Sequence, residues 1–262
     1  MIQPPQFIET FLSLPIPLLG LIIFAVWGGM AVLMHRLVVP AISGSDGHAL
    51  GTFEAEVASQ VGIVLGLLLS FNAVTVWEQS SAARDATLAE ASALREVADM
   101  LPELPAEQRD AVRASLRDYL HYVIEIEWPA LASSQVGLNK PASLRRLARL
   151  GRAGTQDLHD PISAAVHARE DRIRIATARM LPARWTIVIV LGALALLAIG
   201  LVHAEHRRAR AVALAMVAFG IASCFVVLLV QARPFLGSLA LQPAELRALA
   251  QELSAPVPPA PP

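Results

Sequence analysis

Three large apolar residues recur every four positions inside an uncharged run of the chain. Residues Val57 to Trp77 include no Asp, Glu, Lys or Arg, and they hold Ile63, Leu67 and Phe71 at i, i+4 and i+8. This spacing puts the three side chains on one face of an α-helix. If identical helices surround an axis, such residues form stacked apolar rings, which can close a pore by excluding water. The same residues also suit a face that meets lipid or another protein segment, and that alternative stays open.

A neighbouring ridge of the same predicted helix consists of small residues. Gly62, Gly66 and Ser70 also stand at i, i+4 and i+8, about 100° around the helix from the apolar ridge. Small side chains allow two helices in a membrane to approach closely. We therefore predict that these residues pack against another helix, while the apolar ridge forms a pore neck.

Asn72 is a polar residue inside the same uncharged run, directly after Phe71. A polar side chain within a membrane needs a hydrogen-bond partner or water. We expect Asn72 either to face a water-filled pore vestibule beside the neck or to bond a neighbouring helix.

Other residue types that could do chemistry give weak signals. His203, Glu205 and His206 could ligate a metal, but they lie in a short connector beside two arginines, and we predict no metal site. Glu125 and Glu127 are two positions apart, on different helix faces, and do not form an acid/base pair by themselves. The chain carries no phosphate loop, nucleophile elbow or dinucleotide fingerprint. We therefore predict neither enzyme activity nor a cofactor, and no nucleic-acid partner.

The composition is that of a membrane protein. Hydrophobic residues make up 55% of the 262 residues and charged residues only 16%, whereas soluble proteins carry about 25% charged residues. Four uncharged segments are long enough to cross about 30 Å of hydrocarbon as helices and to contact membrane lipid. They are residues 16–34, 57–77, 185–202 and 211–230. The sequence therefore predicts an all-α membrane protein with four transmembrane helices.

A hydrophilic insert separates the second span from the third. Residues 78–184 hold 15 of the 21 Lys and Arg and 15 of the 22 Asp and Glu, and their apolar residues recur at helical spacing. No Pro or Gly follows Trp77 for more than twenty residues, so we expect the second span to continue out of the membrane as a stalk. The insert is thus predicted to be a helical region.

Proline positions suggest where the later helices of the insert begin and end. We expect one helix from Pro105 that Pro129 ends, and a short helix around Leu144 to Leu150. A further helix should begin with Asp160 as N-cap and Pro161 as its first residue, and run to Leu181. After the fourth span we expect a cytoplasmic C-terminal segment, residues 231–254, and a disordered Pro-rich tail, residues 255–262.

The arginines predict an orientation in the membrane. Nine lie near span ends on the side that holds the insert and both termini, against four on the other side. Cytoplasmic segments carry the excess of basic residues, so we expect the insert and the termini in the cytoplasm. Trp77 and Trp185 would then be anchors at the cytoplasmic membrane interface.

Several stretches resemble the bestrophin-like family of bacterial membrane proteins, which is distantly similar to the bestrophin ion channels. They are LGLLLSFNAVTVWEQSSAARDATLAEASALREV at residues 65–97, EIEWP at 125–129, LPARW at 181–185 and RPFLGSLALQPAEL at 233–246. The resemblance implies a multi-pass protein of the bacterial cytoplasmic membrane, a pentameric homo-oligomer with cytoplasmic termini, and inorganic ions as its cargo. It also implies that the second helix lines the pore, with Ile63, Leu67 and Phe71 at the neck.

Two functions follow from these patterns. The first is an oligomeric ion channel with an apolar neck on the second transmembrane helix. The alternative is a non-conducting membrane scaffold or sensor, whose insert binds a partner and whose spans only anchor and oligomerise it. Ion flux would support the first, and stable capture of a partner through residues 78–184 would support the second.

Overall fold

The computed structural model is helical in all the regular elements that it describes, which fall within residues 14–44, 54–132, 137–153, 156–178, 182–232, 234–237 and 240–254. The side chains of residues 156 and 182–184 are not described. The expected tail, residues 255–262, and the expected helix end at Leu181 lie outside this part of the chain. Within it, the fold divides into two compact units, Met1–Glu78 with Arg179–Ala232, and Gln79–Ala178 with Arg233–Pro262.

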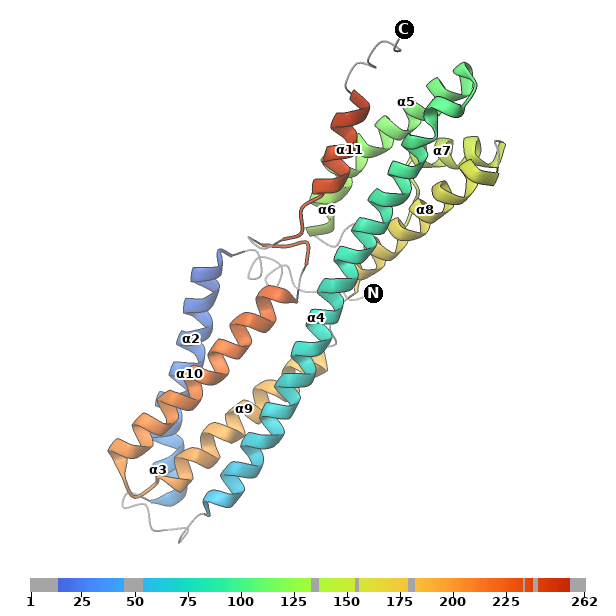
Figure 1. The fold of residues 1–262 in the computed structure, drawn as a ribbon. Helices are drawn as coiled ribbons and strands as arrows, with labels where there is room; N and C mark the ends of the chain where they lie inside the picture. Colours follow the sequence, from blue (N-terminus) through green and yellow to red (C-terminus); the bar gives the residue numbers. More distant parts are fainter. Residues whose placement is uncertain are drawn as a thin grey trace. The chain divides into compact units, whose positions relative to one another are not determined.

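Four helices of the described chain are long and apolar enough to cross a membrane, as predicted. The first combines α2 (Ile16–Leu33), the π-helical turn η1 (Met34–Val38) and α3 (Val39–Ser43), so it continues beyond the predicted end at residue 34. The other three are α4 (Ala55–Asp99), α9 (Pro182–Val202) and α10 (Arg207–Gln231). Helix α4 is continuous over 45 residues, in agreement with the predicted stalk (Figure 1).

The first unit packs α2, α9 and α10 around aromatic side chains. Trp27 of α2 lies with its ring centroid 5.3 Å from that of Phe225 of α10, and Trp185 of α9 lies 5.9 Å from the same ring. A Cβ atom at Gly192 of α9 would overlap the Trp27 ring. Glycine at this position therefore lets the indole approach the α9 backbone.

The second unit contains the rest of α4 and the shorter helices. These are α5 (Ala106–Tyr122), α6 (Trp128–Ala132), α7 (Ala142–Ala153), α8 (Gln156–Thr177) and α11 (Ala244–Ser254), with the turns η2 (Leu101–Glu103) and η3 (Val123–Glu127). Helix α7 forms where the leucine spacing predicts it. The C-terminal helix α11 joins this core through Leu246, Leu249 and Leu253.

Pro129 does not end its helix, contrary to the prediction. The π-helical turn η3 precedes it, and α6 carries Pro129 as its second residue. Proline cannot donate a backbone hydrogen bond and its ring clashes with the carbonyl four residues earlier. A wider π-turn removes the need for that bond, and Pro40 follows η1 in the same way.

The predicted start of the last insert helix at Asp160 and Pro161 is also wrong. Helix α8 begins at Gln156 and holds Pro161 in its interior. Leu158 is 0% exposed and belongs to the core of the second unit. An earlier start places this leucine in the core, and its burial offsets the single backbone hydrogen bond that Pro161 cannot make.

Candidate pore-lining face and buried ion-pair cluster

The predicted neck residues lie on an exposed face of α4. Ile63, Leu67 and Phe71 are 66%, 56% and 62% exposed in the single chain. The face of α4 that packs inside the first unit is another one, and it carries Leu65 at 5% exposure. At 100° per residue, Leu67 points about 160° away from Leu65. The apolar ridge is thus a large hydrophobic surface without a partner among the described residues of its own chain.

The small-residue ridge is open as well. A Cβ atom added at Gly62 or Gly66 would meet nothing within 4 Å. Ser70 is exposed, and its hydroxyl donates a hydrogen bond to the Gly66 carbonyl oxygen at 2.9 Å. No described segment of the same chain occupies this ridge, so it remains available to a second helix.

Asn72 is half-buried and its amide donates to the Leu68 carbonyl oxygen at 2.8 Å. The Thr75 hydroxyl donates to the Phe71 carbonyl oxygen at 2.9 Å in the same pattern. One N–H donor of Asn72 is thus satisfied within its own helix, and the Thr75 hydroxyl donor likewise. The two tryptophans that the sequence predicts as interface anchors differ in exposure: Trp77 is 72% exposed, whereas Trp185 is half-buried against Phe225.

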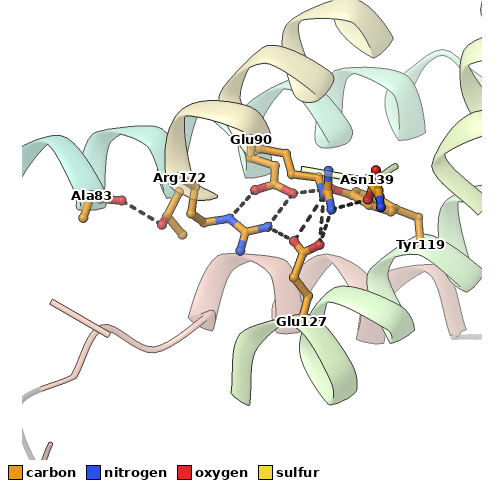
Figure 2. Close-up of polar contacts among 8 residues, drawn as sticks. Ala83, Glu90, Tyr119, Glu127, Asn139 and Arg172 are labelled. Carbon is orange, nitrogen blue, oxygen red and sulfur yellow. Dashed lines mark hydrogen bonds and ion pairs between the residues drawn. The ribbon is translucent and has the colours of Figure 1, made fainter. Parts of the chain in front are cut away.

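A second group of functional interest is a buried ion-pair cluster in the second unit, formed by Glu90, Tyr119, Glu127, Arg169 and Arg172. Their side chains come from α4, α5, η3 and α8, and all five residues are 0% or 1% exposed. Figure 2 shows the two carboxylates converging on the Arg172 guanidinium. The cluster therefore joins four elements through one set of charged contacts.

Arg172 occupies the middle of this cluster. Its Nε donates to Glu90 Oε2 at 2.7 Å, and its Nη2 donates to Glu127 Oε1 at 2.7 Å. Arg169 binds the same Glu127 carboxylate through Nε at 2.9 Å and through Nη2. Two arginines and two glutamates balance in charge, which is the condition under which ionised groups can be buried.

The surroundings act on the charge of Arg172 in opposite directions. Burial alone would lower the pKa of the Arg172 guanidinium, but the Glu90 carboxylate and its hydrogen bond outweigh burial, and the pKa is raised. The guanidinium carbon also lies 5.1 Å from the centroid of the Trp128 ring. The Nη1 atoms of Arg169 and Arg172 are buried without a hydrogen-bond partner in the described chain. The indole face offers Arg172 a cation–π contact.

Residues 21–246 match the model of the Bestrophin-like domain. The chain belongs to the bestrophin-like family. The predicted resemblance is thus confirmed, and a search of curated proteins finds no match.

Solved structures share the fold of this bestrophin-like protein. A point variant of a bacterial bestrophin homologue from Klebsiella pneumoniae aligns with a TM-score of 0.64 at 13% identity, covering 88% of this chain and 95% of that one. A structure described as a membrane protein variant also aligns with a TM-score of 0.64, at 16% identity, covering 88% of this chain and 97% of that one. At these identities the likeness concerns the fold.

Sequence reasoning missed the buried cluster of this bestrophin-like protein. It considered Glu127 only as one member of a pair with Glu125 and found no chemistry, whereas Glu125 is exposed and Glu127 is buried against two arginines. Glu90 and Arg172 are 82 positions apart. The available signal was the pair Arg169 and Arg172, three residues apart on a helix face that also carries the apolar residues Ala165, Val166 and Ile173.

The phenol of Tyr119 should resist ionisation. Burial, followed by the negative charge of Glu90, raises its pKa well above 10, and its hydroxyl donates to Glu90 Oε1. A raised folded-state pKa contributes stability that is present below about pH 10 and is lost as the pH rises through the folded value. In a Tyr122→Phe variant, which leaves Tyr119 as the single tyrosine, we expect tyrosinate absorbance to appear together with unfolding. Ionisation of the folded variant near pH 10 would contradict this.

Proposed function

We propose that this bestrophin-like protein is a homo-oligomeric ion channel of the bacterial cytoplasmic membrane. In this proposal α4 lines an axial pore, and Ile63, Leu67 and Phe71 form its neck. The observation that carries the proposal is the exposed apolar ridge on α4, which lies opposite the face that packs inside the chain. Membership of the bestrophin-like family supports it.

Assembly around an axis gives both open ridges of α4 a role. In a ring of identical chains, the ridge of Gly62, Gly66 and Ser70 permits close approach of a neighbouring subunit. The apolar ridge, rotated by about 100°, then points toward the axis. The resemblance to bestrophins favours five subunits, with the insert and both termini in the cytoplasm. Side chains of this size in stacked rings would gate by excluding water from the neck.

Ser70 and Asn72, the polar residues next to Phe71, do not belong to the three proposed apolar rings. The hydroxyl of Ser70 and the amide of Asn72 both bond carbonyl oxygens of their own helix. Asn72 directly follows Phe71, so in the proposed channel it would be the first polar side chain after the Phe71 ring on the side of Trp77. We assign it to the entrance of a hydrated vestibule.

Mass and flux measurements on the purified protein test the proposal. We expect the detergent-solubilised protein to have the mass of a pentamer, and the reconstituted protein to release potassium chloride from liposomes faster than empty liposomes do. A monomer or dimer cannot surround an axis with α4 helices and would contradict the channel. An oligomeric ring that conducts no ions but captures a stable partner through residues 78–184 would favour the scaffold function instead.

A further inference from the structure

A groove of about 510 Å³ runs between α2 and α10 in the first unit. Figure 1 shows the two helices side by side. Most of the lining is apolar, with Phe24 and Phe219 at one end, their ring centroids 5.1 Å apart. His35 and Arg36 line the groove further along. The groove is therefore amphipathic along its length.

The length of the groove fits one lipid leaflet. Phe24 and Arg36 are twelve residues apart, which is about 18 Å along a helix. One leaflet of a bilayer contributes about 15 Å of hydrocarbon, half of the core. An acyl chain that starts beside Arg36 and ends beside Phe24 would thus run the full depth of its leaflet.

The polar end of the groove is strongly basic. Within residues 16–44 and 203–231 there are four arginines and one acidic residue, Glu205. Arg36 lines the groove, and Arg207 lies one helical turn before the lining residue Ala211 on the same face of α10. Buried Arg210 donates from Nε to His35 Nδ1 at 3.3 Å. Positive charge thus gathers where the apolar lining ends.

Helix α10 adds to this positive potential. Its first turn carries basic residues and no acidic residue. The N-terminus of a helix already bears a partial positive charge, so arginines there are less favourable than at the other end. An anion beside this turn would neutralise the arginines and complement the helix dipole.

We propose that this groove binds one anionic glycerophospholipid per subunit. The lipid phosphate lies against Arg36 and Arg207, and an acyl chain follows the apolar walls toward Phe24 and Phe219. A phospholipid suits both ends, because basic pockets between membrane helices bind anionic headgroups. The uncharged segments 16–34, 57–77, 185–202 and 211–230 offer no carboxylate, so a second copy of this chain would have to bring an acidic residue from outside them to the basic end.

Lipid counting by native mass spectrometry tests this site. Delipidated protein is mixed with dioleoyl phosphatidylglycerol or with dioleoyl phosphatidylcholine. We expect wild type to bind phosphatidylglycerol more tightly. Arg36→Gln should weaken the binding of phosphatidylglycerol about fivefold, which is the contribution of one arginine near an anionic lipid. The same substitution should leave the binding of phosphatidylcholine unchanged.

Two adjacent glycines supply a matched pair of steric variants. A Cβ atom at Gly28 or at Gly29 would meet nothing within 4 Å, so both positions accept a larger side chain. Gly28 lines the groove and Gly29 is outside its lining. Gly28→Leu should therefore fill the groove and weaken the binding of phosphatidylglycerol. The Gly29→Leu variant should bind this lipid as tightly as wild type does.

Three outcomes would overturn the proposal. Equal binding of the two lipids by wild type would show that the basic end of the groove does not recognise the anionic headgroup. Equal effects of Gly28→Leu and Gly29→Leu on phosphatidylglycerol binding would show that the acyl chain does not lie in the groove. Loss of oligomer mass in Gly28→Leu, with no phosphatidylglycerol retained by wild type, would assign the groove to a second copy of the chain. All three readouts are independent of ion flux.

Discussion

Replacing Arg172 with methionine should lower the thermal unfolding midpoint of the detergent-solubilised protein by on the order of 10 °C. The substitution removes the positive charge between Glu90 and Glu127, both of which are buried. Removing one partner of a buried ion pair costs about 3–5 kcal/mol, because the remaining charge keeps its desolvation penalty without its counter-charge. Glu127 keeps Arg169, whereas Glu90 keeps only the hydrogen bond from Tyr119 among these partners.

Arg174→Met is the matched control on the same helix. The Arg174 side chain is 72% exposed and pairs with Asp171 at 3.1 Å, and exposed pairs of this kind contribute about 0–1 kcal/mol. Adding Glu90→Leu to Arg172→Met should restore part of the lost stability, because it removes the unpaired charge. Equal unfolding midpoints for Arg172→Met and Arg174→Met would show that the cluster does not stabilise the second unit.

Truncating the neck should raise ion flux severalfold. In the Leu67→Ala/Phe71→Ala variant, two of the three proposed rings lose most of their side-chain volume, so the neck widens and the barrier to its hydration falls. Both residues are more than half exposed in the single chain. Their truncation therefore leaves no cavity in the subunit core, and the unfolding midpoint should change little. Flux is measured in liposomes at equal protein density.

Met216→Ala provides the control for this variant. Met216 lies on α10 and is 70% exposed, so the substitution also removes exposed apolar surface from a spanning helix. It should leave flux at the wild-type level. If wild type and the Leu67→Ala/Phe71→Ala variant conduct no ions while remaining oligomeric, α4 does not line a conducting pore, and the scaffold function becomes the better account.

Much of the architecture follows from local properties of the sequence. The four spans are set by uncharged length, because a helix must be apolar over the whole hydrocarbon thickness. The continuity of α4 beyond Trp77 follows from the absence of Pro and Gly. The two ridges of α4 follow from the helical period alone, and the exposed state of both is compatible with the predicted assembly.

Proline positions were less reliable guides than apolar spacing. Pro129 and Pro161 both lie within helices, where sequence rules place helix boundaries. The rules describe an isolated helix, in which a lost hydrogen bond is decisive. Here a π-turn accommodates Pro129. The burial of Leu158 favours a start of α8 at Gln156, before Pro161. A tertiary contact outweighed the local cost at Pro161, whereas a local change of helix type accommodated Pro129.

The sequence by itself determined the membrane class, the number of spans and the residues that share each face of α4, since these depend on residues close together in the chain. Only the tertiary structure decided which face of α4 is packed and which is open. It also brought Glu90 beside Arg172, and α11 against α5. Such contacts join residues tens of positions apart, and their pairing depends on how whole helices dock, which no local spacing specifies.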